Sequence, residues 1–345
     1  MKKSVRTILF LIIFASIGAF IAYKFDLLEK IINKDSVNGK MPITIYVDKP
    51  KVKIIDVNSN SRPIAVSINN NHAAWPQAGL QDAYLSYELI AEGGITRILA
   101  FFKDTNTEKI GSVRSARHYF LDYVLENDAI FVHYGHSPQA LSDIKSLGIN
   151  NINGMYDASA FYRDKTLKRA SEHTAFTTME KIKKAIKSKG YRTETDKGTL
   201  LKYSAVNKDY SKDETSKVAN NVSITYSDYQ TTSYVYDKEN KVYKMYMSKE
   251  EHNDLVTKKQ YTVKNIITYQ VENSSIDKKG RQNLYNTGKG EGYFISNGIA
   301  TKIKWSKVSR SAKTKYTLMD GTELVVNDGN TWIHIQPKNK TLSIE

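Results

Sequence analysis

The sequence contains no cysteine among its 345 residues. Disulfide bonds, thiol catalysis and attachment through a lipidated cysteine are therefore excluded, and a zinc site would need histidine and acidic ligands alone. The chain also lacks a Gly-x-Ser-x-Gly nucleophile elbow, a clear aspartate-rich metal motif and a convincing internal repeat. We therefore assign no metal and no cofactor to this chain.

Charged residues are missing from one stretch near the N-terminus, residues 8–23, and basic residues precede it. A cationic flank stays on the cytoplasmic side of a membrane. Residues 8–28 are long enough to span a bilayer if Lys24 extends its ammonium group to the interface. We predict a cytoplasmic tail at 1–7 and a retained signal anchor, a single transmembrane helix, at 8–28. The bulk of this single-pass protein of the cell membrane is then extracellular. A cleaved signal peptide is the alternative, although no convincing small-x-small cleavage site follows the apolar core.

Positive charge is in excess, with 51 lysine and arginine residues against 36 aspartate and glutamate residues and a net charge of +15. An exported protein of this charge meets anionic lipid headgroups and anionic wall polymers, so we expect no nucleic-acid partner. The lysines are dispersed along the chain, and most of them are expected to lie on solvated faces. The charge therefore predicts a general attraction to an acidic envelope.

Length and a hydrophobic content of 40% predict two domains besides the anchor. Residues 29–61 have weak periodicity and are predicted to form a stalk. Residues 62–200 combine apolar strands with helical patterns, whereas 221–345 alternate tyrosine, valine, isoleucine and threonine between turn signals. The predicted fold class is α+β: a layered αβ N-terminal domain, a linker at 201–220 and a mostly β C-terminal domain.

The stretch 84–117 packs two carboxylates and three guanidinium groups into a short span. Apolar residues alternate with polar ones around Glu88 and Glu92, which is the period of a half-buried strand, so the two glutamates are predicted to share one face. The two glycines that follow suit a two-residue hairpin turn. Such a turn pairs Ile90 with Arg97 and places Arg97 on the face of the glutamates.

The spacing of these glutamates limits the chemistry that they can perform together. In a strand they lie roughly 13 Å apart along the backbone, at about 3.3 Å per residue. Glycosidases that use paired carboxylates hold them about 5–9.5 Å apart. We therefore predict a lone acid, with Glu92 as the first candidate catalytic residue and Glu88 as the second, and with Arg97 holding the other carboxylate. The alternative is an ion-paired sheet face without chemistry.

Arg114 and Arg117 flank the predicted start of a helix. Ser115 is a candidate N-cap for a helix over 116–126, whose free backbone amides and positive end attract anions. Together with Arg97, these arginines are candidate substrate-binding residues for carboxylates, phosphates or the peptide acid of the wall. Alternatively, one of the arginines pairs with a glutamate and neutralises that face.

His133, His136 and Ser137 lie where a predicted strand ends and a helix begins, with Pro138 in its first position. This is a common place for ligand-facing groups in layered αβ folds, so these three residues and His173 are further candidate substrate-binding residues. A Ser–His nucleophile and a histidine metal site are alternatives that lack their defining motifs. Isolated histidines more often serve as hydrogen-bonded packing residues.

Several segments occur in the order found in a known family. They are Arg62-Pro-Ile-Ala-Val, Tyr87-Glu-Leu-Ile-Ala-Glu-Gly-Gly-Ile-Thr-Arg97, Gly111-Ser-Val-Arg-Ser-Ala-Arg117, Phe131-Val-His-Tyr-Gly-His-Ser-Pro-Gln-Ala140 and Gly329-Asn-Thr-Trp-Ile-His-Ile335. Across nearly all of 62–338 the chain resembles the YerB-like family of bacterial, mostly Gram-positive, envelope proteins. The resemblance implies an αβ N-terminal domain with layered sheets and a distinct C-terminal domain. Members are often lipoproteins by prediction, but this chain lacks the lipobox cysteine, which leaves the apolar segment at 8–23 for attachment.

The leading hypothesis is a membrane-anchored extracytoplasmic protein that acts on peptidoglycan glycan, as a lytic transglycosylase or another glycosidase with a single glutamate acid. The rival hypothesis is a noncatalytic envelope module that binds an anionic wall polymer or a cell-wall partner protein through the same arginines. Its binding would weaken with salt and show no turnover. Phosphate-group transfer on a lipid-linked polymer is a third hypothesis. All of them require the acids and guanidinium groups to meet in one solvent-accessible hollow.

Overall fold

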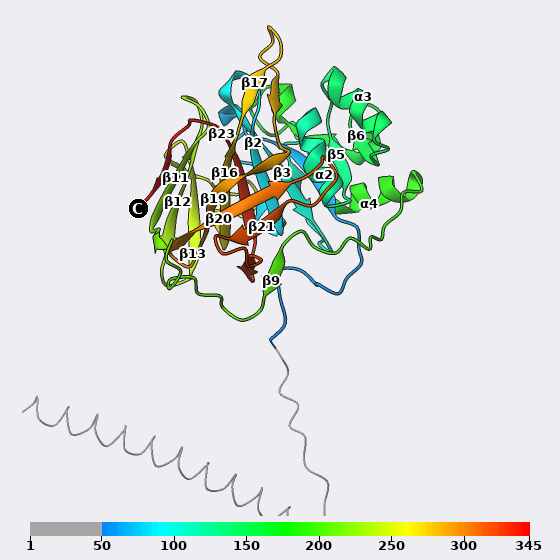
Figure 1. Cartoon of the computed structure of the whole chain (residues 1–345). Coiled ribbons are helices and arrows are strands. Elements are labelled where there is room, and N and C mark those ends of the chain that lie inside the picture. Colours follow the sequence, from blue (N-terminus) through cyan, green and yellow to red (C-terminus); the bar gives the residue numbers. More distant parts are fainter. Residues whose placement is uncertain (1–49) are drawn as a thin grey trace, which may run out of the picture. The chain divides into compact units, whose positions relative to one another are not determined.

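Strands make up most of the regular structure in residues 50–345, the part of the chain that the computed structural model describes (Figure 1). The first half contains, in chain order, β1 Ile64–Asn69, β2 Leu85–Ile90, β3 Thr96–Phe102, β4 Ile110–Gly111, α2 Leu121–Glu126, β5 Ile130–His133, α3 Pro138–Ser146, β6 Asn151–Asn153, β7 Tyr162–Arg163, β8 Ala175–Thr177 and α4 Met179–Ser188. The second half contains β9 Lys202–Ser204, β10 Lys217–Val218, β11 Asn221–Thr225, β12 Thr231–Asp237, β13 Val242–Met247, β14 Glu250–Glu251, β15 Thr262–Val263, β16 Asn265–Val271, β17 Asn273–Ser275, β18 Gln282–Leu284, β19 Gly288–Ser296, β20 Ile299–Lys307, β21 Lys315–Leu318, β22 Val325–Asn327, β23 Thr331–Pro337 and β24 Leu342–Ile344. Short 3₁₀ turns lie at His72–Ala74, Leu80–Asp82, Glu92–Gly94, His118–Phe120, Ala158–Ala160 and Ser171–His173. The fold is therefore mostly β with few helices.

One 11-stranded sheet takes strands from both halves of the chain. Its order is β10-β20-β19-β16-β23-β2-β3-β1-β5-β6, with β21 paired to β20. At its centre β2 of the first half pairs in parallel with β23 of the second, and Glu88 lies opposite His334. The linker predicted at 201–220 therefore separates the halves in sequence but does not separate their main sheets. Residues 50–345 form one compact unit built around this shared sheet.

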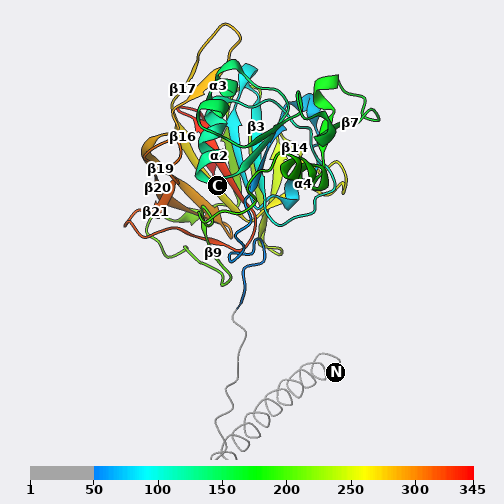
Figure 2. The ribbon, with the colours of Figure 1, turned by 90° about the vertical axis from the view of Figure 1, so that its right-hand side faces the viewer.

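The centre of the large sheet is covered on both faces. The six-stranded sheet β14-β13-β12-β11-β24, with β15 paired to β13, covers one face. Figure 1 shows β11, β12 and β13 on the left of the central strands and α2, α3 and α4 on the right. Figure 2 looks onto the helical side, where α2 lies in front of the central strands. Helix α2 packs there through Tyr123, which stacks on Tyr87 of β2.

Every residue of β2 and β23 is buried as a consequence of this double cover. The prediction of a half-buried strand around Glu88 is therefore wrong, because the second sheet covers the face that alternation assigns to solvent. Polar side chains in these two strands must find their hydrogen-bond partners inside the protein.

Helices α3 and α4 begin and end at the signals that the sequence carries. The hydroxyl of Ser137 accepts a hydrogen bond from the backbone of Ala140 as the N-cap of α3, and Pro138 occupies the first turn. Gly148 follows α3 and Gly190 follows α4, each with a positive φ of 62° that a helix C-terminus favours. The helix expected after Ser137 is confirmed.

The helix predicted over 116–126 is wrong at its start. The backbone stays extended through Arg117, a 3₁₀ turn follows, and α2 begins only at Leu121. The hydroxyl of Ser115 caps no helix and donates instead to the carbonyl of Tyr134 at 3.1 Å. Backbone hydrogen bonds hold this segment extended. The N–H of Arg114 donates to the carbonyl of Ser67 on β1 at 2.8 Å, and the N–H of Ala116 donates to the carbonyl of Gly135, in the loop after β5, at 2.9 Å. Tertiary pairing overrides the local helix signal here.

The predicted stalk at 29–61 is packed against the folded unit from residue 50 onward. Ile55 is buried in the main core. The carboxylate of Asp328 accepts hydrogen bonds from the backbone N–H groups of Lys53 and Ile54 at 2.9–3.0 Å. Residues 50–61 therefore belong to the domain, which corrects the stalk prediction for this part.

The remainder of the predicted stalk, the cytoplasmic tail at 1–7 and the signal anchor at 8–28 lie outside the described residues. Within 50–345, none of the helices combines the length and the apolar character needed to cross a membrane.

Candidate functional site

The hairpin between β2 and β3 decides where the predicted site residues point. Arg97 pairs with Leu89 and not, as predicted, with Ile90. The turn spans 91–95, and the backbone N–H of Ala91 donates to the carbonyl of Ile95 at 2.7 Å. Because side chains alternate across a strand, this one-residue difference in register moves Arg97 to the face opposite Glu88. The prediction of one face shared by both glutamates and Arg97 is therefore wrong.

Glu88 lies in a closed polar network between the two sheets. Its carboxylate accepts hydrogen bonds from Thr96 at 2.6 Å, from Asn70 at 3.2 Å and from Thr232 at 2.8 and 3.0 Å. The side chain has no solvent exposure. Burial raises the pKa of Glu88 to about 7, although the hydrogen bonds act in the opposite direction. Such a pKa suits proton transfer, but no polymer can reach this carboxyl group.

His334 extends the same network, and sequence reasoning did not select it. Its Nδ1 lies 3.5 Å from the carboxylate of Glu88 and 2.8 Å from the hydroxyl of Tyr226, while its Nε2 lies 2.7 Å from the hydroxyl of Tyr234. Burial lowers the pKa of His334 to about 3, so the ring is neutral. The one signal in the sequence that could have drawn attention to His334 is its position as a lone histidine inside an apolar strand. Such a histidine more often serves packing than chemistry.

Glu92 lies in the hairpin turn among arginines. Arg117 binds its carboxylate through Nε at 2.5 Å and through a terminal nitrogen at 3.0 Å, and Arg97 contacts it at 3.3 Å. Burial by itself raises the pKa of Glu92, but the hydrogen bonds from Arg117 and the charges of both arginines outweigh it, so the pKa lies below its usual value. Glu92 is therefore ionised at neutral pH and lacks the proton that a general acid must donate.

Arg114 adds a third guanidinium group beside this pair. Its side chain reaches only the carbonyl of Glu172, at 3.4 Å, and its Nε is buried without a hydrogen-bond partner. Burial lowers the pKa of Arg114 and the charge of Arg117 lowers it further, whereas Glu172 and Glu92 act in the opposite direction. Among the salt bridges of residues 50–345, Arg117 and Arg97 bind Glu92, whereas Arg114 forms none. We refer to Arg97, Arg114, Arg117 and Glu92 as the arginine cluster. It holds three cationic groups and one carboxylate.

Backbone contacts position this cluster. Arg97 on β3 donates to the carbonyl of Ser115 at 2.8 Å, and Arg117 donates to the carbonyl of Ala116 at 2.8 Å. These bonds tie the guanidinium groups to the extended segment that carries two of them. The cluster is therefore preorganised, although not by the helix N-terminus that the sequence predicts.

His136 and His173 flank the arginine cluster. Asn153 donates to Nδ1 of His136 at 3.1 Å, and Asn69 donates to Nδ1 of His173 at 2.8 Å, which leaves the proton of each neutral ring on Nε2. Burial lowers the pKa of both histidines, and a neighbouring arginine lowers it further. Both rings are therefore neutral near pH 7.

His133 and Ser137 have structural roles. The buried ring of His133 lies 2.7 Å from the carbonyl of Gly135 and 3.2 Å from the side chain of Asn151. Ser137 is engaged as the cap of α3. Within residues 50–345, no three histidine or acidic side chains are grouped so that they can hold a metal ion.

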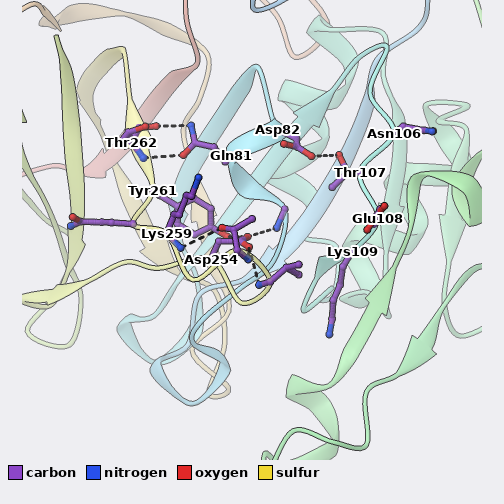
Figure 3. A pocket seen from close by; sticks show the side chains of 14 residues that line it. Gln81, Asp82, Asn106, Thr107, Glu108, Lys109, Asp254, Lys259, Tyr261 and Thr262 are labelled. Carbon is purple, nitrogen blue, oxygen red and sulfur yellow. Dashed lines mark hydrogen bonds between the residues drawn. The ribbon is translucent and has the colours of Figure 1, made fainter. Parts of the chain in front are cut away.

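The hollow in Figure 3 lies away from all of these residues. It has a volume of about 570 Å³ and lies where Gln81, Asp82 and Thr107 of the first half meet Asp254 and Tyr261 of the second. Two of its three acids are engaged: Asp254 accepts from the hydroxyl of Tyr261 at 2.6 Å, and Asp82 accepts from Thr107 at 2.8 Å. The third acid, Glu108, is exposed. Other hydrogen bonds join the two halves here: the backbone N–H of Gly79 donates to Asp254 at 2.8 Å, and Gln81 and Thr262 exchange two hydrogen bonds at 2.9 and 3.1 Å.

Comparisons with known proteins agree with this architecture. Residues 52–192 match the family model described as "Protein of unknown function (DUF3048) N-terminal domain", and 222–333 match its C-terminal domain. A protein of Bacillus subtilis named "Putative lipoprotein YerB" is 32% identical over 337 residues, which cover 94% of this chain and 96% of that protein. The crystal structure of the YerB protein from Bacillus subtilis superposes with a TM-score of 0.74 at 31% identity, and the match covers 86% of this chain and 100% of that one. The chain therefore belongs to the YerB-like family and carries both the N- and the C-terminal DUF3048 domains.

Proposed function

We propose that this protein is an envelope protein that binds an anionic wall polymer through the arginine cluster without cleaving it. The observation that carries the proposal is that three guanidinium groups lie around one salt-bridged carboxylate, Glu92, while Glu172 acts on Arg114 through its charge without a salt bridge. Arginine binds phosphate and carboxylate groups through paired, charge-assisted hydrogen bonds. An incoming anion would use Arg114 first, since this arginine lacks a carboxylate partner within 50–345.

Binding is favoured over glycan cleavage by the state of the two glutamates. Cleavage by a lone acid needs a protonated carboxyl group within reach of the glycosidic oxygen. The arginines keep Glu92 ionised, and the two sheets seal Glu88. Peptidoglycan cleavage by either residue stays a prediction, and phosphate transfer has no further support.

The proposed location is the outer face of the cell membrane, with attachment through residues 8–28. The support is the uncharged stretch at 8–23, the net charge of +15 and the lipoprotein name of the relative from Bacillus subtilis. This chain has no cysteine to carry a lipid, so its attachment would differ from that of a lipoprotein.

Arg114→Gln tests the binding proposal. We expect the affinity for inorganic polyphosphate, used as a defined anionic probe, to fall about 10-fold or more, because a hydrogen bond to a charged group contributes about 1.5–3 kcal/mol. Binding to residues 50–345 can be measured by calorimetry at several salt concentrations, and the affinity should fall as salt rises. Arg192→Gln is the matched control, because it removes the same charge from a side chain that is 53% exposed. Equal losses in both variants, or release of glycan products from isolated walls, would contradict the proposal.

Glu92→Gln separates binding from catalysis. Glu92 competes with an external anion for Arg117, so we expect the neutral variant to bind polyphosphate several-fold more tightly. A catalytic acid would behave differently: the variant would lose product release from isolated walls while the wild type shows it. Thermal unfolding of both proteins checks that the arginines tolerate the loss of their partner. Unchanged or weaker polyphosphate binding by a folded variant would show that Glu92 does not compete for the site.

A further inference from the structure

A second hollow lies between α4 and the end of the large sheet where β1 and β5 begin and β3 ends. Its volume is about 600 Å³, within the range of about 300–1,000 Å³ that is typical of small-ligand sites. The apolar part of its lining, which we call the floor, consists of Ile64, Phe102, Ile130, Met179, Ile186 and Tyr191. Four separate elements and the segment after α4 supply these side chains. Five of these side chains are buried, with Phe102 at 0% and Ile130 at 1% exposure, so the floor is the outer edge of the core and Tyr191 is its most exposed member.

The rim of this hollow is cationic. Lys183 and Lys187 stand one turn apart on α4, and Lys103 lies on the opposite wall. Asp104 is the one acidic residue in the lining. Arg62 also lines the hollow, but its guanidinium group is engaged with Asn150, with backbone carbonyls and with a carboxylate on the loop before β5.

The three rim lysines are not neutralised by acids within salt-bridge distance. The ammonium group of Lys103 donates to the carbonyl of Ser59 at 2.7 Å, and that of Lys183 donates to the carbonyl of Thr105 at 3.1 Å. Neither these two nor Lys187 takes part in a salt bridge among residues 50–345. Carbonyl partners leave the positive charge in place, so the rim favours an anion.

We propose that this hollow binds a single-chain anionic amphiphile of the fatty-acid class. The acyl chain would lie on the apolar floor, and the headgroup would contact Lys103, Lys183 and Lys187. A purely polar anion would leave the floor without a partner, and a neutral hydrocarbon would leave the rim charge unused. The site is separate from the arginine cluster, so the two proposals can fail independently.

Chain length and charge provide the test. Residues 50–345 form one compact unit and correspond in extent to the crystallised relative, so this fragment is titrated with decanoate, dodecanoate and tetradecanoate below their micelle concentrations. We expect the dissociation constant to fall about 4-fold for each added methylene, the value that follows from burial of about 0.8 kcal/mol per CH₂. Dodecanol, with the same chain and no charge, should bind at least about 10-fold more weakly than dodecanoate.

Helix α4 offers a matched pair of variants for the rim. Lys183→Glu with Lys187→Glu should weaken dodecanoate binding by at least about 10-fold, since each surface lysine contributes about 1 kcal/mol toward an anionic headgroup. Lys181→Glu with Lys184→Glu changes the net charge equally on the same helix but away from this hollow, and should leave the affinity within about 2-fold. A dissociation constant that does not depend on chain length, equal binding of dodecanol, or equal losses in the two variants would overturn the proposal.

Discussion

Replacing Lys307 by methionine is expected to lower the free energy of unfolding by about 3–5 kcal/mol, because it leaves an unpaired carboxylate in the core. Lys307 lies on β20 and Glu126 ends α2, their charged atoms are 2.8 Å apart, and neither side chain is exposed. The remaining donors to this carboxylate are the hydroxyl of Tyr87 and the backbone and hydroxyl of Thr314. Urea unfolding of residues 50–345 at neutral pH measures the loss.

Two comparisons show whether burial causes this effect. Lys338→Met removes one partner of a surface pair whose side chains are 56% and 66% exposed, and should cost less than about 1 kcal/mol. Adding Glu126→Gln to the Lys307→Met variant removes the unpaired charge and should restore part of the lost stability. If Lys307→Met costs no more than Lys338→Met, the pair does not stabilise the contact between the two halves.

The stability of the wild type should depend on pH through Glu88. The pKa of Glu88 is about 7 in the folded protein against 4.5 for the free side chain. The contribution of the protonated carboxyl group is therefore fully present below pH 4.5 and is lost as the pH rises through 7. Glu88→Gln cannot ionise. The stability of this variant relative to the wild type should increase by about 3 kcal/mol between pH 4.5 and pH 8 or above.

The measurement is the difference in unfolding free energy between the two proteins across that pH range. Glu180→Gln is a suitable control, because Glu180 is 75% exposed on α4 and its neutralisation should leave a nearly constant difference from the wild type above pH 6. Parallel curves for Glu88→Gln and the wild type would mean that the buried carboxyl group titrates as it does in water.

Both predictions concern contacts that join the two halves of the chain. Glu88 receives hydrogen bonds from Thr232, and Glu126 binds Lys307. Arg310 likewise binds Asp122 of α2 at 2.6 Å. These buried polar contacts explain why the halves form one unit although two family models cover them. They also explain why Glu88, in the most distinctive stretch of the sequence, serves the fold.

The arginine cluster shows what a sequence-based choice of residues can miss even where the chosen residues meet. Sequence reasoning selected Glu92, Arg97 and Arg117, and the structure brings them together. It placed them on a strand face and at a helix start, whereas they meet in a hairpin turn and on an extended segment. The chemistry changes as a result, because Glu92 is held as a carboxylate and not as an acid.

The sequence by itself determined the features that depend on near neighbours. Ser137 and Pro138 start α3, Gly148 and Gly190 follow α3 and α4, and alternation marks the strands β11, β12 and β13, because caps, turns and periodicity act over a few residues. The lack of cysteine and the ordered family segments likewise need no coordinates.

Only the tertiary structure decided the register of the central hairpin, the burial of Glu88 and the extended course of the segment around Arg114. Each depends on partners far away in the chain: the hydroxyl of Thr232 that binds Glu88 is 144 residues away. Local patterns cannot report such contacts, because the free energy that selects them comes from burial and hydrogen bonds formed after distant segments meet.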